Sequence, residues 1–165
     1  MAFIGLVAEK QKYEFVNNNL SKDMNKNDIT LININKNSIN NLQRVKFDAI
    51  VVLNSLDKLM VETQIINNIC KNVKFFILNS DLEIINNPFD NITTNVITFG
   101  LNQKATVTFS SITDEDILVS VQREFKNSQN KTIEQGEYSY KISKIDRTNL
   151  QEILVEFIIE KIYFD

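Results

Sequence analysis

Two polar side chains that could meet a ligand follow an apolar segment in the middle of the chain. The segment is 75–78, and Asn79 and Asp81 come directly after it. Ligands of open α/β sheets bind at the carboxyl ends of strands, so this amide and this carboxylate are candidate binding groups. Asn and Asp are also common turn residues, and turn formation is the simpler interpretation of the same pair.

Several kinds of chemistry are excluded by residues that the sequence lacks. Histidine is absent, and only three glycines occur, Gly5, Gly100 and Gly136. Without an imidazole, the chain supplies no Ser-His or Cys-His pair and no imidazole metal ligand. A glycine-rich phosphate cradle needs several glycines in one loop, and these three are widely separated. The sequence therefore predicts neither a hydrolase triad nor such a cradle.

The composition also limits the partners. The 165 residues carry a formal net charge of −3, and Lys and Arg are scattered along the chain. Because nucleic-acid binding needs a concentrated basic face, we expect no nucleic-acid partner. There is no apolar run of membrane-spanning length, so we expect no membrane insertion. Cys70 lies among Ile66, Ile69 and Val73, which predicts a buried thiol, no internal disulfide and a cytoplasmic location.

The first hundred residues alternate between strand-like and helix-like patterns. Apolar or alternating segments predict strands at 3–7, 29–34, 49–53 and 75–78. Apolar residues at helical spacing predict helices over 9–20 and 56–70. Continuous aliphatic strands separated by helices require a parallel sheet that is covered on both faces. The sequence therefore predicts a three-layer α/β fold with a mostly parallel sheet.

After Gly100 the apolar pattern changes to a period of two residues. Alternation over 105–110, 117–125 and 137–142, with turn residues at 127–130, predicts an antiparallel β extension. Tyr138 and Tyr140 lie on one face of the last strand, and we interpret this face as a candidate partner surface.

The end of the chain predicts one helix over 150–162. Its apolar residues form one wide face, and we expect the other side chains to point into water: Gln151, Glu152, Glu156 and Glu160. Thr148 and Gln151 have the spacing of a capping box at the start of this helix. We expect one domain over 1–165, made of a parallel α/β part at 1–101, the antiparallel extension at 102–145 and the C-terminal helix at 146–165.

The stretch 74–112 resembles the end of one family's nucleotide-binding domain. Its Asn79-Ser80-Asp81 element, followed by Val-Ile-Thr-Phe-Gly at 96–100 and a β-hairpin, is similar to the central, ATP-binding domain of the Mur ligases. The resemblance implies a P-loop NTPase-like fold and ATP and magnesium sites upstream. It covers about one domain of the three in a complete ligase, without the flanking N- and C-terminal domains.

The resemblance places the family's phosphate-binding loop at 5–13, where only Gly5 and Lys12 match the family pattern. The loop of the family works because glycine backbone N–H groups surround the phosphates while a hydroxyl holds magnesium. The departures are Ala8 and Gln11 for two glycines, Tyr13 for the hydroxyl residue and Glu9 where phosphate oxygens would sit. We expect poor ATP binding at this degenerate loop, and Lys12 is more simply a solvated lysine.

The other positions that the resemblance implies are also altered. Asn33 stands where the family has a magnesium-binding Glu, and a neutral amide lacks the charge that favours magnesium. Asn54 and Asp57 keep the amide and the acid of a later motif, although both could instead cap the helix that begins near residue 56. In the last motif, at 146–152, only Asn149 remains. The vestigial nucleotide-binding set is Lys12, Asn54, Asp57, Asn79, Asp81 and Asn149.

Three functional hypotheses follow. The first is a non-catalytic relative of the Mur ligases, a pseudoenzyme without cofactor that serves as an interaction or scaffold module in cell-wall or spore-envelope assembly. It would have a protein partner or form a homo-oligomer. The second is a nucleotide-binding subunit of an ATP-dependent ligase that a partner chain completes, with ATP and magnesium as cofactors. The third is an unrelated small-ligand or regulatory α/β binding domain.

Overall fold

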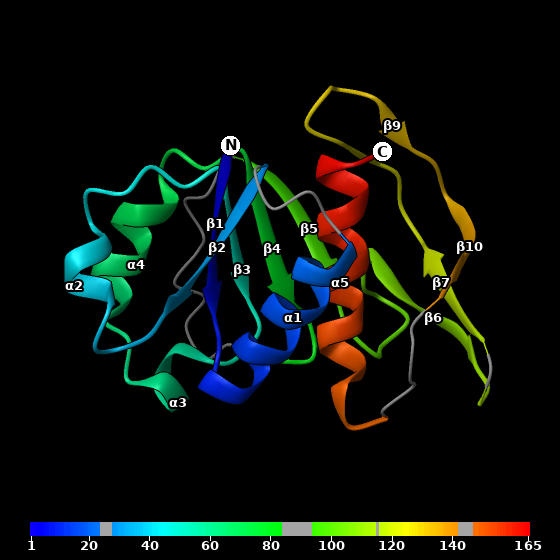
Figure 1. Ribbon diagram of the computed structural model, residues 1–165, viewed down its shortest axis with the longest axis horizontal. Helices are drawn as coiled ribbons and strands as arrows, with labels where there is room; N and C mark the ends of the chain where they lie inside the picture. The colour runs from blue at the N-terminus through cyan, green and yellow to red at the C-terminus, as the bar shows by residue number, and fades with distance from the viewer. Residues whose placement is uncertain (24–27, 84–93, 115, 142–146) are drawn as a thin grey trace.

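An eight-stranded sheet is the centre of the computed structural model, which describes residues 1–23, 28–83, 94–114, 116–141 and 147–165 (Figure 1). The strand order is β10-β7-β6-β5-β4-β3-β1-β2. The parallel strands are β1 (Ala2–Val7), β2 (Ile29–Ile34), β3 (Ala49–Val52), β4 (Phe75–Asn79) and β5 (Asn95–Phe99). The prediction of an α/β fold with a mostly parallel sheet is confirmed.

Helices cover the sheet from both sides. The helices α1 (Lys10–Asp23) and α5 (Leu150–Tyr163) pack on one face, together with the apolar side chains that alternate strand residues send to that side. The other face is covered by α2 (Ile39–Leu42), α3 (Leu56–Leu59) and α4 (Thr63–Cys70). Gly5 faces this second layer, where a Cβ would lie 2.5 Å from the Cδ1 atoms of both Ile34 and Ile50. A side chain at residue 5 would therefore overpack the layer.

The parallel strands follow the order 2-1-3-4-5 of a doubly wound sheet. The chain leaves β1 through α1 on one face and leaves β2 through α2 on the other, so the direction of winding reverses between β1 and β3. In sheets of this kind, the crevice at the carboxyl ends of the two strands beside the reversal is the usual ligand-binding position. Here that position falls between the residues after Val7 and those after Val52.

The antiparallel extension continues the same sheet. The strands β6 (Val107–Ile112), β7 (Ile117–Val121) and β10 (Gly136–Tyr140) pair antiparallel, and β6 joins β5 through one parallel pair, Phe99 and Val107. The predicted strand over 117–125 ends at Val121. A separate hairpin follows, in which β8 (Phe125–Lys126) pairs with β9 (Thr132–Ile133) around the predicted turn at 127–130.

The predicted helix over 56–70 is divided in two. Met60 has φ of 53°, in the left-handed region, and its N–H donates to the carbonyls of Asp57 and Leu56. This residue ends α3, and the buried side chain of Val61 enters the second layer before α4 begins at Thr63. The apolar spacing was compatible with one helix because α3 and α4 bury their apolar side chains in the same layer of the core.

The prediction for the terminal helix was wrong about its acidic side chains. Only 1% of Glu152 and 3% of Glu156 are exposed, because α5 lies against the sheet, α1 and the tyrosines of β10 at once. The N-cap residue also differs from the predicted one. A 3-10 turn, Arg147–Asn149, precedes α5, and the N-cap residue is Asn149, whose side chain makes no cap hydrogen bond.

The tyrosines of β10 pack against the C-terminal helix. The rings of Tyr138 and Tyr140 pack against Phe157 of α5, with centroid separations of 5.8 and 5.7 Å. The Tyr140 hydroxyl donates to Glu160 at 2.9 Å. Both side chains are therefore half-buried against α5, and their interpretation as a partner surface stays a prediction. Within the described ranges, no helix is long and apolar enough to cross a membrane.

Cys70 is buried in the second layer, as predicted, and it has no disulfide partner. Burial raises the pKa of its thiol to about 12. Because the thiolate is the reactive form, we predict that Cys70 of the native protein does not react with an aromatic disulfide reagent at pH 8 and reacts fully after unfolding in urea. The variant N40C, at an exposed position of α2, is the control and should react within minutes. Rapid reaction of native Cys70 would contradict this packing.

Candidate functional site

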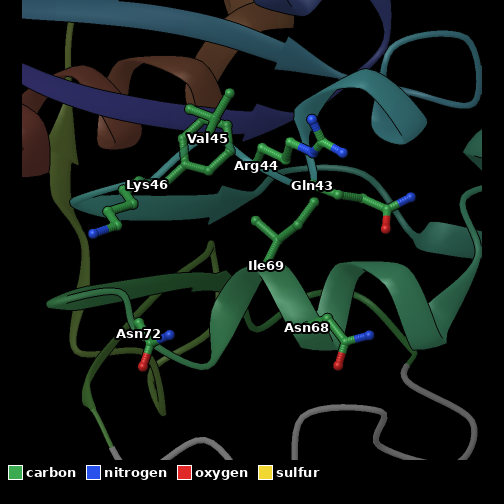
Figure 2. Close-up of a pocket in the computed structure, with 8 residues that line it drawn as sticks. Gln43, Arg44, Val45, Lys46, Asn68, Ile69 and Asn72 are labelled. Atoms are coloured by element: carbon green, nitrogen blue, oxygen red, sulfur yellow. The ribbon is translucent and has the colours of Figure 1, made fainter.

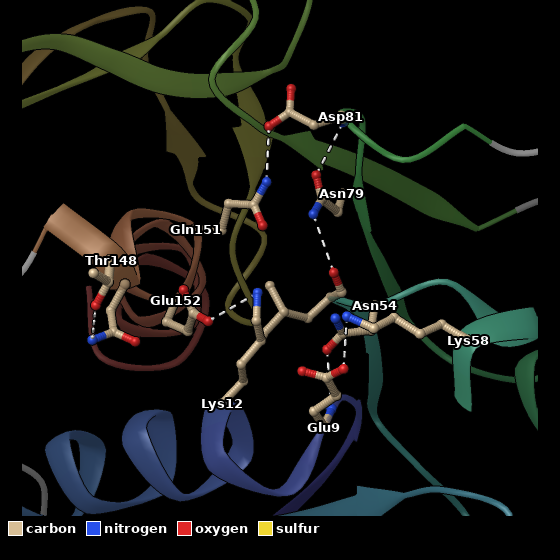
Figure 3. A network of polar contacts seen from close by, with 11 residues as sticks. Glu9, Lys12, Asn54, Lys58, Asn79, Asp81, Thr148, Gln151 and Glu152 are labelled. Atoms are coloured by element: carbon tan, nitrogen blue, oxygen red, sulfur yellow. Dashed lines mark hydrogen bonds and ion pairs between the residues drawn. The ribbon is translucent and has the colours of Figure 1, made fainter.

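A cluster of polar side chains lies at the carboxyl ends of β1, β3 and β4, beside the start of α5 (Figure 3). We call it the edge cluster. Its members are Glu9, Lys12, Asn54, Lys58, Asn79, Asp81, Gln151 and Glu152. The parallel strands end at the same edge of the sheet, and α5 returns across that edge, so segments far apart in the sequence meet here.

Lys12 is paired with the buried acid of α5. Its Nζ lies 3.2 Å from Oε1 of Glu152, and the exposed fractions of the two side chains are 28% and 1% (Figure 3). That oxygen accepts no well-directed hydrogen bond from the described residues, so the ammonium charge is its compensating contact. A buried carboxylate without a cation is strongly unfavourable. Lys12 is therefore a structural counter-ion, and its interpretation as a solvated lysine was wrong.

Glu9 follows β1 at the edge of the sheet where β1 and β3 end. Its carboxylate lies 2.7 Å from Nζ of Lys58, and its backbone N–H donates to Oδ1 of Asn54 at 3.0 Å. The hydrogen bond from Lys58 holds the pKa of Glu9 below its ordinary value. A negative side chain and its own counter-ion thus lie at the position where sheets of this order bind ligands.

Asn79 and Asp81 form the turn that the sequence suggested as the simpler interpretation. Asn79 is 1% exposed, its amide donates to the carbonyl of Leu53 at 3.1 Å, and its Oδ1 accepts from the N–H of Asp81 at 3.0 Å. The side chain of Asn79 therefore ties the end of β4 to the end of β3. The amide of Asn79 therefore uses both its N–H donor and its oxygen acceptor within the protein.

The carboxylate of Asp81 is held by three donors. It accepts from the N–H of Leu101 at 2.7 Å, from Nδ2 of Asn102 at 2.7 Å and from Nε2 of Gln151 at 3.0 Å. Partial burial alone would raise the pKa of Asp81, but these hydrogen bonds outweigh it and hold the pKa below its usual value. Gly100 allows this approach, because a Cβ there would lie 2.7 Å from Oδ1 of Asp81.

Two of the predicted site residues lie outside the cluster's contacts. Asp57 is exposed on α3, and the cap of this helix is Ser55, whose Oγ accepts from the N–H of Lys58 at 3.4 Å. The prediction that Asn54 and Asp57 cap this helix was therefore wrong. Asn149, at the start of α5, donates to the hydroxyl of its neighbour Thr148 at 3.3 Å. Asp146, from the same sequence motif, lies outside the described residues.

Asn33, at the position where the resemblance implies a metal-binding acid, is also engaged. Its amide donates to the carbonyl of Ala8 at 3.0 Å, and its Oδ1 accepts from the amide of Asn35. In the described part of the chain, no three or more His, Cys, Asp or Glu side chains are grouped to hold a metal ion.

Sequence reasoning missed Gln151, Glu152 and Lys58. The signal for Glu152 was present, since the apolar residues of 153–159 point in every direction around the helix and leave no wide polar face. Gln151 was assigned to a capping box because its spacing to Thr148 is correct. Its contact with Asp81 joins residues that are far apart in sequence, and no local pattern encodes it.

Comparison with protein-family models and with curated proteins gives no significant match for this chain. The site is therefore interpreted from its geometry.

We predict that the Lys12–Glu152 pair stabilises the fold. The variant K12M leaves the carboxylate of Glu152 buried without a cation and should lower the free energy of unfolding by about 2–3 kcal/mol, measured by urea denaturation. The double variant K12M/E152L should recover much of this loss, because no buried charge remains.

The matched control is K10M, on the same helix. Lys10 is 86% exposed and lies 3.7 Å from Glu14, so its removal should change stability by less than about 0.5 kcal/mol. Equal effects of K10M and K12M would contradict the assignment of Lys12 as a counter-ion.

The network at Asp81 predicts a pH dependence. Its folded-state pKa is lowered, so its contribution to stability is present above the unfolded-state pKa, about 4, and is lost as pH falls through the folded-state value. We expect D81N to be less stable than the native chain by about 1 kcal/mol at pH 7. The difference should narrow below about pH 4.

Urea unfolding at pH 7 and at pH 3 measures this difference. D57N is the control, because Asp57 is exposed on α3, and it should differ from the native chain by less than about 0.5 kcal/mol at pH 7. A D81N difference that stays constant with pH would show that the carboxylate charge does not hold this network.

Proposed function

We propose that this protein is a non-catalytic relative of the Mur ligases that keeps the scaffold of their central domain as an interaction module, acting in cell-wall or spore-envelope assembly. The relationship rests on the sequence resemblance at 74–112. The parallel sheet that continues into antiparallel strands packed on a C-terminal helix is compatible with it.

The pairing of Lys12 with Glu152 is the observation that supports a non-catalytic role. A lysine that binds phosphate must offer its charge to the ligand, but here the charge compensates a buried carboxylate at 3.2 Å. Releasing Lys12 would leave Glu152 uncompensated, so nucleotide binding would carry the cost of breaking this pair. Glu9 adds a second negative charge at this edge of the sheet and already binds Lys58.

The edge cluster offers few free groups to magnesium or to phosphate. Asp81 accepts from three donors, and both functions of the Asn79 amide are engaged. A ligand would have to replace these internal hydrogen bonds without new donors from a glycine-rich loop. The alternative, an ATP-binding subunit that a partner completes, therefore requires this edge to be rebuilt.

The proposed module would bind a protein partner or a second copy of itself. One edge of the sheet is poorly suited to strand addition, because the carbonyls of Leu31 and Asn33 in β2 already accept from the hydroxyls of Tyr13, at 3.1 Å, and Ser38, at 2.9 Å. The opposite edge is β10, whose Glu137 and Ser139 are exposed. We place the partner contact at this edge.

Sedimentation measurements over a range of concentrations test whether the partner is a second copy. A dimer that S139K weakens and T30K, on β2, does not weaken would support self-association through β10. Association that T30K abolishes and S139K leaves intact would contradict this placement.

Thermal unfolding with magnesium and ATP tests the non-catalytic role. A ligand at one hundred times its Kd stabilises a protein by about 2.7 kcal/mol, which for a chain of this size is a Tm increase of roughly 5–10 °C. We predict a change of less than about 1 °C at millimolar nucleotide. A saturable, magnesium-dependent increase that is lost in K12Q would overturn the proposal and favour the nucleotide-binding subunit.

A further inference from the structure

A cleft with a different character lies at the other end of the strands from the edge cluster. It is lined by residues 43–47 of the loop before β3, by Asn68 and Ile69 of the last turn of α4, and by Asn72, which follows that helix (Figure 2). Its volume is about 390 Å³, which falls in the range of small-molecule pockets. The amino ends of β3 and β4 are beneath it, so it shares no residue with the edge cluster.

The centre of the cleft is apolar. Phe47 and Ile69 are only 5% and 8% exposed and belong to the second layer of the core, and the partly buried Val45 packs against that layer. Figure 2 shows Ile69 projecting from α4 toward the loop that carries Val45. Partly buried apolar side chains of this kind gain free energy when the apolar part of a ligand replaces the water that covers them.

The rim of the cleft is cationic. Its polar lining consists of Arg44, Lys46 and the amides Gln43, Asn68 and Asn72, and no acidic residue of the described chain lines it. Figure 2 shows the Arg44 and Lys46 side chains extending in different directions from the loop. The chain as a whole has a formal net charge of −3, so this local excess of positive charge is not a general property of its surface.

The nearest acid along the chain is already engaged. Asp48 follows the loop, and its carboxylate accepts from Nζ of Lys74 at 3.0 Å and from the N–H of Phe3 at 3.1 Å. It is not part of the cleft lining. Arg44 and Lys46 therefore line the cleft without a carboxylate among its described lining residues.

We propose that this cleft binds a small organic anion. The apolar body of the ligand rests on Val45, Phe47 and Ile69, its carboxylate or phosphate group is held by Arg44, and Lys46 adds positive charge on the other side of the rim. A guanidinium forms paired hydrogen bonds with either of these groups, and an ammonium adds a second positive charge. The limited volume and the two cations suit a small molecule better than a nucleic acid. The site is independent of the proposed function, which its failure would leave unchanged.

Amide NMR titration tests the site with four probes: phenyl phosphate, benzoate, benzyl alcohol and inorganic phosphate. We expect phenyl phosphate and benzoate to shift the amide signals of 43–47 and 68–72 with saturation at about 10 mM or below. Benzyl alcohol has the apolar body without the charge, and inorganic phosphate has the charge without the body. Each should bind at least about tenfold more weakly than phenyl phosphate.

The variants R44Q and K46Q should each weaken phenyl phosphate binding by about threefold to fivefold, since both cations are near the surface. The control K10Q removes one charge from a distant exposed position and should leave binding unchanged. The amide spectra also report whether each variant is folded. The proposal would be overturned if no probe saturates, or if the shifts fall only on other residues. It would also be overturned if benzyl alcohol binds as tightly as phenyl phosphate, or if K10Q weakens binding as much as R44Q and K46Q do.

Discussion

The burial of one carboxylate constrains much of this molecule. Glu152 is carried into the interior by a helix most of whose other side chains are apolar, and its charge must be compensated there. The compensating ammonium comes from Lys12 of α1, so the pair fixes how α1 and α5 lie on the same face of the sheet. A second polar contact, from Asn19 to Glu156 at 3.0 Å and one turn further along α5, supports the same helix pair.

This constraint links the fold to the proposed function. The carboxyl edge of the parallel sheet is where an α/β protein of this winding meets a ligand, and here α5 and the loop after β1 bring their own carboxylates to it. The amides of Asn54 and Asn79 and the carboxylate of Asp81 form hydrogen bonds with backbone groups of neighbouring segments. The result is an edge whose polar groups are satisfied within the chain, which is a stable arrangement for a scaffold and a poor one for nucleotide chemistry.

The sequence predicted what depends on local patterns. Apolar runs and one alternating segment predicted four of the parallel strands, alternation predicted the antiparallel extension, and the residues after 78 predicted the turn at Asn79 and Asp81. It did not predict contacts that depend on tertiary packing. The break at Met60 needs a left-handed residue without a glycine signal, and the burial of Glu152 follows from the surroundings of α5 on several sides.

The proposed non-catalytic role depends most directly on whether the Lys12 ammonium group stays paired with Glu152. NMR of the lysine side chains, with Lys12 assigned by comparison with K12Q, can follow this group during a titration with magnesium and ADP. If Lys12 is the counter-ion of Glu152, its Nζ signal should be resolved in the native protein and lost or shifted in E152Q. Adding nucleotide should leave the signal of the native protein unchanged. A Lys12 signal that moves with saturation as nucleotide is added, while the E152Q variant shows the same response, would contradict the proposed non-catalytic role.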